Sequence, residues 1–238
     1  TNEKGLKSFI RGATWINGFV NQMGWLGDSY FSLPWAYSEL NADLLGAQAA
    51  NQNISSINLP KSITPSGGGP AFFSYPLTQS QNIRAFNTRA FTGAGSNALY
   101  YQWSAMYSLN YGMNGVLPII GKLKYAGNAD DKKNTYKAWC YFWKGYAYAA
   151  IGSQYIAGII NDKPIIDGVP PTTSNNYVSQ DQVIAQSNLY YDSARIAIGK
   201  ISNKANSGSD YASVLTDLIP DFFQVGLGGV PKIGRAHV

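Results

Sequence analysis

The residues best suited to ligand chemistry are aromatic rings and arginines gathered between residues 60 and 95. Flat aromatic faces can stack on the C–H surfaces of sugar rings, and each such contact contributes about 0.5–1.5 kcal/mol beyond burial. Tyr75, Arg84 and Arg89 combine a flat face with a polar head. We hypothesise that these three residues line a ligand-binding face. Phe72 and Phe91 complete the candidate set, although each is more simply explained as an anchor that pins a long loop to the core.

The segment that carries these residues has few signs of regular structure. Proline and glycine break both helix and central strand throughout it, at Pro60, Pro65, Gly67-Gly-Gly-Pro70 and Pro76. Irregular loops of this length are uncommon inside compact domains and are often functional. We therefore expect residues 48–95 to be an irregular loop insertion.

The rest of the chain shows helical periodicity. Apolar residues at three- and four-residue steps predict helices over 5–24, 33–45, 97–117, from about 130 to 151, and 180–201. Pro118 is expected to end the third helix, and Ser179 with Gln182 has the spacing of a capping box at the start of the fifth.

The later helices begin near residues 97, 132 and 180, at roughly the spacing of tetratricopeptide units. Each such hairpin leaves an apolar face that only a neighbouring hairpin can cover. The predicted fold class is therefore mainly α, with stacked tetratricopeptide-like helical hairpins and one long irregular loop insertion.

Composition indicates the surroundings in which the chain works. Only 13% of the residues are charged, against about 25% in average domains, so neutral polar side chains must solvate the surface. This favours an extracytoplasmic protein that meets neutral, hydroxyl-rich ligands. The net charge of +5 comes from scattered lysines and arginines, which excludes a nucleic-acid interface. Cys140 lies in an apolar helical stretch and is expected to be a buried, inert thiol.

Two other interpretations are disfavoured by the residues. Residues 138–160 contain one charge and could span a bilayer, but their tyrosines lie all around the helix, which favours a buried helix. A glycoside hydrolase would need two carboxylates about 5–9.5 Å apart, for which Asp28, Glu39 and Asp43 are the candidates. The single histidine, His237, leaves no histidine-based catalytic or metal site. We expect no enzyme activity, no cofactor and no metal.

The last six residues, 233–238, are expected to be a non-native tail. They read as one translation frame of a common short-read sequencing adapter, so we do not expect them to belong to the fold. This predicts that the chain is a C-terminally truncated fragment.

The order of elements resembles the N-terminal part of the SusD/RagB family of outer-membrane nutrient-binding lipoproteins. The segments that carry the resemblance follow one another along residues 5–231. They are Asn41-Ala-Asp43, Tyr101-Gln-Trp-Ser-Ala-Met-Tyr107 with Asn114, Lys144-Gly-Tyr-Ala-Tyr148, Asn176-Tyr-Val-Ser-Gln-Asp-Gln-Val183 and Tyr191-Asp-Ser-Ala194. One departure is Lys144, which stands where the family usually has arginine.

This resemblance implies a location and a function. Residues 1–232 would form the N-terminal helical region of a protein on the extracellular face of the outer membrane, lipid-anchored through a segment upstream of Thr1. Such proteins bind oligosaccharides or similar nutrients and deliver them to a TonB-dependent, SusC-like transporter. A helical-repeat scaffold for protein interactions is the alternative, and it would have no need of an aromatic loop.

Overall fold

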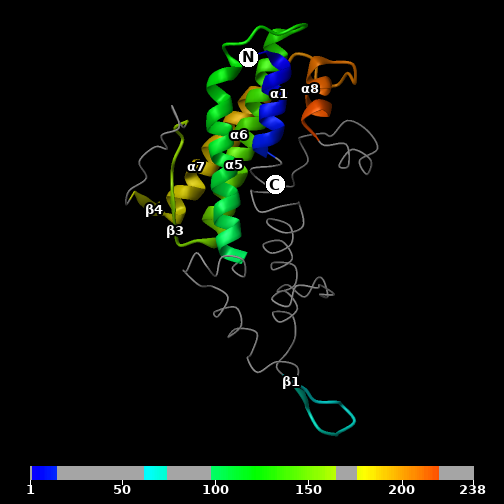
Figure 1. The fold of residues 1–238 in the computed structure, drawn as a ribbon, viewed down its shortest axis with the longest axis vertical. Helices are drawn as coiled ribbons and strands as arrows, with labels where there is room; N and C mark the ends of the chain where they lie inside the picture. The colour runs from blue at the N-terminus through cyan, green and yellow to red at the C-terminus, as the bar shows by residue number, and fades with distance from the viewer. Residues whose placement is uncertain (1, 15–61, 74–97, 165–175, 220–238) are drawn as a thin grey trace. The chain divides into compact units, whose positions relative to one another are not determined.

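The chain is mainly helical, as the apolar periodicity predicts. The computed structural model describes residues 2–14, 62–73, 98–164 and 176–219. Two compact units are distinguished, one made of residues 1–18 and 106–238 and the other of residues 19–105. Five helices in the described residues are α1 (Glu3–Arg11), α5 (Ala98–Ile120), α6 (Ala129–Gln154), α7 (Gln180–Gly199) and α8 (Asp210–Leu218) (Figure 1).

Helix α6 is the centre of the first unit. It packs most extensively on α7 and also contacts α8, while α1 lies against α8 (Figure 1). The core between these helices contains large side chains that are fully buried, among them Leu6, Ile10, Met113, Tyr136, Tyr148, Ile151 and Leu215. Cys140 is also fully buried, as predicted, and burial raises the pKa of its thiol, which disfavours the reactive thiolate.

Glycines let α6 and α7 approach closely. A Cβ on Gly145 would lie 2.9 Å from the Tyr191 ring, and one on Gly152 would lie 2.6 Å from the Ile184 side chain. The start of α7 has the predicted capping box, in which Ser179 and Gln182 bond each other's backbone amides. The fifth predicted helix is therefore confirmed, with an end at Gly199.

Two predictions about helix ends need correction. Pro118 does not end α5, which continues to Ile120. Proline in the last turn removes one backbone hydrogen bond, and the complete burial of Ile120 favours the two extra residues. The first helix is α1 up to Arg11, followed by a wider π turn over residues 12–14. The predicted continuation over 15–24 and the predicted helix over 33–45 lie outside the described residues.

Short strands occur where no strand was predicted. Residues Ala157–Ile159 (β3) pair antiparallel with Tyr177–Ser179 (β4), with Gly158 opposite Val178. In the other unit, Ser62–Ile63 (β1) pair with Phe72–Phe73 (β2) around the glycine-rich turn. Gly68 and Gly69 have φ values of 81° and 127° there, a conformation that favours glycine. The segment expected to be wholly irregular therefore contains a small hairpin.

Helix α8 is fixed through the α5–α6 connection. Gly127 has φ 73°, and the next amide, that of Asn128, donates to Asp210 Oδ2 at 2.7 Å. A Cβ on Gly127 would lie 2.7 Å from the same oxygen, so this position needs glycine. Lys132 adds an ion pair to Asp210 at 3.6 Å. These contacts set the position of α8 beside α6.

None of the described helices is both long enough and apolar enough to cross a membrane. Helix α6 ends at Gln154, and the chain turns into β3 at Ala157. Residues 138–160 are therefore a helix followed by a strand.

Candidate functional site

The most concentrated polar chemistry in the core surrounds Lys144 on α6. Its ammonium group donates to Oδ1 of Asn110 at 2.8 Å, to Oδ1 of Asp162 at 2.9 Å, and to Oδ1 of Asn114. The side chain is completely buried, and its Nζ lies 4.5 Å from the centre of the Tyr190 ring. Burial lowers the pKa of Lys144, and the Asp162 carboxylate opposes that shift.

The partners of Lys144 are bonded in turn. Asp162 also accepts hydrogen bonds from Tyr148 Oη and Gln186 Nε2, both at 2.9 Å. Burial beside the Asp162 carboxylate raises the pKa of Tyr148. Because a lysine ammonium group has three protons and all three are used here, this cluster is a structural centre.

The same cluster holds the chain that follows α6. The Asn161 carbonyl accepts from Nδ2 of Asn110 at 2.7 Å and from Nδ2 of Asn114 at 2.9 Å. Tyr107 Oη donates to the Ile159 carbonyl at 3.0 Å and accepts from the Ile159 amide at 2.6 Å. Burial raises the pKa of Tyr107 to about 12. The end of β3 at Ile159 and the following Asn161 are therefore hydrogen-bonded to α5.

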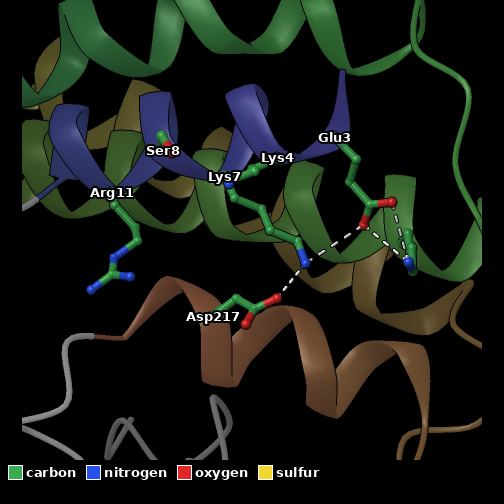
Figure 2. A pocket seen from close by; sticks show the side chains of 7 residues that line it. Glu3, Lys4, Lys7, Ser8, Arg11 and Asp217 are labelled. Carbon is green, nitrogen blue, oxygen red and sulfur yellow. Dashed lines mark hydrogen bonds and ion pairs between the residues drawn. The ribbon is translucent and has the colours of Figure 1, made fainter. Parts of the chain in front are cut away.

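A charged pocket of about 480 Å³ lies in the described part of the chain. It lies on α1 with contributions from α6 and α8, and Figure 2 shows the side chains that line it. The lining residues are Glu3, Lys4, Lys7, Ser8, Arg11, Lys132 and Asp217. Its volume lies within the range of about 300–1,000 Å³ that is usual for small-molecule sites, but its lining is charged where such sites are mostly apolar.

Ion pairs cross the pocket between the helices. Lys132 Nζ donates to the two oxygens of Glu3 at 3.0 and 3.2 Å, and Lys7 pairs with Asp217 (Figure 2). Tyr136 Oη also donates to Glu3, at 3.3 Å, and its pKa is raised by burial and by this carboxylate. The pairs join α1 to α6 and α8 around the pocket.

One of the five predicted ligand residues lies in a described element. Phe72 lies in β2, where Ile63 is its partner in β1, but its side chain is outside the described part of the molecule. Tyr75, Arg84, Arg89 and Phe91 also lie outside the described residues, so their convergence stays a prediction. The same holds for the hydrolase candidates Asp28, Glu39 and Asp43.

The charged pocket was not predicted from the sequence. A signal was present, because Lys4, Ser8 and Arg11 stand one turn apart opposite the apolar stripe that was used to predict the helix. Within residues 2–14, 62–73, 98–164 and 176–219, no group of three or more His, Cys, Asp or Glu side chains could hold a metal ion.

Comparison with known proteins identifies no relative. No family model, no curated protein and no solved structure matches the chain.

Proposed function

We propose that this chain is the N-terminal helical region of a SusD/RagB-type nutrient-binding protein. It would sit on the extracellular face of the outer membrane through an upstream lipid anchor. There it would bind an oligosaccharide or similar nutrient and deliver it to a TonB-dependent, SusC-like transporter.

One observation carries the proposal: residues by which the sequence resembles the family meet in the folded chain. Asn114, in the segment that begins at Tyr101, accepts a hydrogen bond from Lys144, which begins the next segment. Gly145, in the segment that begins at Lys144, packs against the ring of Tyr191, which begins the last segment. Residues from three of the resembling segments therefore contact one another across α5, α6 and α7, as the proposal expects.

Lysine in place of the usual arginine fits this arrangement. Arginine and lysine both offer a positive charge and several donors, and the ammonium group suits three acceptors that surround a single point. The departure at Lys144 therefore leaves the proposed relationship intact.

Sugar binding can be tested on the chain itself. The chain would be screened against soluble polysaccharides by affinity electrophoresis, and oligosaccharides of a retained polysaccharide would then be titrated by calorimetry. We expect Tyr75→Ala to weaken binding up to about tenfold, the effect of losing roughly 1.4 kcal/mol of ring contact. Arg84→Ala and Arg89→Ala should each weaken it as well, because each loses guanidinium hydrogen bonds.

Matched controls are available on the described surface. Tyr177 is 61% exposed, and the Arg195 side chain is 77% exposed. Tyr177→Ala and Arg195→Ala should leave affinity unchanged. Unaltered affinity in all three loop variants would refute the ligand face at residues 60–95.

The transporter partnership needs a separate experiment. The protein would be co-expressed with a candidate SusC-like, TonB-dependent transporter, and the pair would be purified in detergent through a tag on the transporter. Stable co-purification is expected, and absence of the complex would refute the delivery role even if sugars bind.

A scaffold for protein interaction is the second candidate, and one observation favours it. Helix α7 exposes Leu189 and Ile196, which are 61% and 54% accessible and lie two turns apart. Exposed apolar residues at helical spacing are typical of a face that contacts another protein. A chain that binds no polysaccharide but captures a protein partner would support this alternative.

A further inference from the structure

The charged pocket on α1 contains an excess of positive charge. Its basic residues are Lys4, Lys7, Arg11 and Lys132, and its acidic residues are Glu3 and Asp217. The acidic residues are already occupied, because Glu3 accepts from Lys132 and Asp217 pairs with Lys7. Among the described residues, Lys4 and Arg11 have no carboxylate partner.

The surplus cations share one face of α1. Lys4, Ser8 and Arg11 follow at steps of four and three residues, so their side chains stand above one another, and all three residues are exposed. Figure 2 shows the Arg11 side chain reaching from α1 toward α8, beyond the pair of Lys7 and Asp217. Arg11 therefore presents its guanidinium group to the hollow between the two helices.

We propose that this pocket is a binding site for an oxyanion group, such as the carboxylate of an acidic sugar or a sulfate. Arg11 would bind the anion through its paired N–H donors, the Ser8 hydroxyl would add a hydrogen bond, and Lys4 would supply a second charge. Lys7 and Lys132 are neutralised by carboxylates and set the borders of the site. This inference does not depend on the ligand face proposed at residues 60–95.

Arg11 also has an explanation that requires no ligand. It lies in the last turn of α1, where a cation stabilises the negative end of the helix dipole. That role would account for Arg11, but it does not account for Lys4 in the first turn, where a cation is unfavourable. A second function for the stripe explains both residues.

Titration of the folded chain with simple ligands tests the proposal. Sodium glucuronate, sodium sulfate and glucose would be added at low ionic strength, and binding would be followed by backbone amide chemical shifts in NMR spectra. We expect glucuronate, sulfate or both to shift amides of residues 4–11 and 210–217, with affinity falling as salt is added. Glucose should shift none of them. An equal response to glucose would overturn the proposal, as would no response to either anion.

The two anions separate the possible ligand sources. A response to both assigns the pocket to oxyanions in general, and a response to only one assigns it to carboxylates or to sulfates.

Substitutions then test whether anion affinity falls or rises as the proposal expects. Arg11→Gln and Lys4→Gln should each weaken binding up to about fivefold, which is the upper end for an exposed charge pair, and the double variant should abolish it. Glutamine has nearly the helix propensity of lysine and arginine, so α1 should stay folded. Asp217→Asn should strengthen binding, because it removes a repelling charge and releases Lys7. The exposed Arg195→Gln is the matched control and should change nothing.

Unchanged affinity in the Arg11→Gln variant would refute the site. Weaker binding in the Asp217→Asn variant would refute it as well, since only a structural role of the ion pair predicts that direction.

Discussion

At the scale of single residues, Lys144 shows how a charge can be kept in a helical core. Its side chain is completely buried, and three oxygens and two aromatic rings surround the ammonium group. A buried charge is tolerated only when it is both paired and hydrogen-bonded. The partial exposure of Asp162, 28% of its side chain, lets water share the cost of that carboxylate.

Removing this charge should destabilise the fold strongly. We expect Lys144→Met to lower the free energy of unfolding by about 3 kcal/mol, because it leaves Asp162 and two amide oxygens without their donor. Lys144→Arg keeps the charge and should cost clearly less. Urea denaturation followed by circular dichroism would measure both, with the exposed Lys124→Met as control. A loss below about 1 kcal/mol for Lys144→Met would contradict this role of the cluster.

At the scale of elements, α6 and α7 pack closely, and glycine makes this possible. The hydrogen of Gly145 faces the Tyr191 ring, which itself packs against Phe142 at 5.9 Å between ring centres. The ring therefore has little room to move away from an added methyl group. Gly199, in the last turn of α7, has no atom within 4 Å of the corresponding position.

These two glycines should respond to alanine in opposite directions. Gly145→Ala is expected to reduce the free energy of unfolding by about 1–3 kcal/mol through overpacking. Gly199→Ala is expected to increase it by up to about 1 kcal/mol, since alanine has the higher helix propensity. Both would be measured by urea denaturation. Equal effects of the two substitutions would mean that α6 and α7 are not in close contact at Gly145.

At the scale of the whole molecule, buried tyrosines make stability depend on alkaline pH. Burial raises the pKa of Tyr107 and of Tyr125 to about 12, and it also raises the pKa of Tyr136, Tyr148 and Tyr190. A raised pKa in the folded state means that the unfolded chain releases its protons first. The stability from these groups is complete below the ordinary tyrosine pKa near 10 and is lost as pH rises through the folded values.

We therefore expect the free energy of unfolding to fall as pH rises above about 10. Lys144 acts in the opposite direction, because its pKa is lowered, but it is one group against several tyrosines. Urea denaturation at about pH 9 and about pH 11 would measure the change. Tyr125→Phe should make the decline shallower. Constant stability across this range would show that the tyrosines are solvated.

Local signals in the sequence determined where several helices begin. The capping box of Ser179 and Gln182 acts within four residues, and Asn128 caps α6 by accepting from the Asp131 amide at 3.1 Å. The apolar spacing also predicted the core positions of α7, with Val183, Ala194 and Ala197 buried. Such features depend on near neighbours, so one sequence is enough to find them.

Tertiary contacts determined the strands and the end of α5, which the sequence did not predict. β3 and β4 form because residues 157–159 meet residues 177–179, and three-residue strands carry no pattern that periodicity could detect. Pro118 remains within α5 because the helix continues to Ile120, whose side chain is buried in the core.

In the two polar sites as well, the sequence indicated single residues, and tertiary packing determined their partners. The sequence marked Lys144 as a motif residue, but its partners Asn110 and Asp162 come from different segments. In the charged pocket, Lys7 and Asp217 are 210 positions apart. Local pattern places Lys7 within reach of Glu3 on the same helix, and only the packing of α1 against α8 brings Asp217 to it.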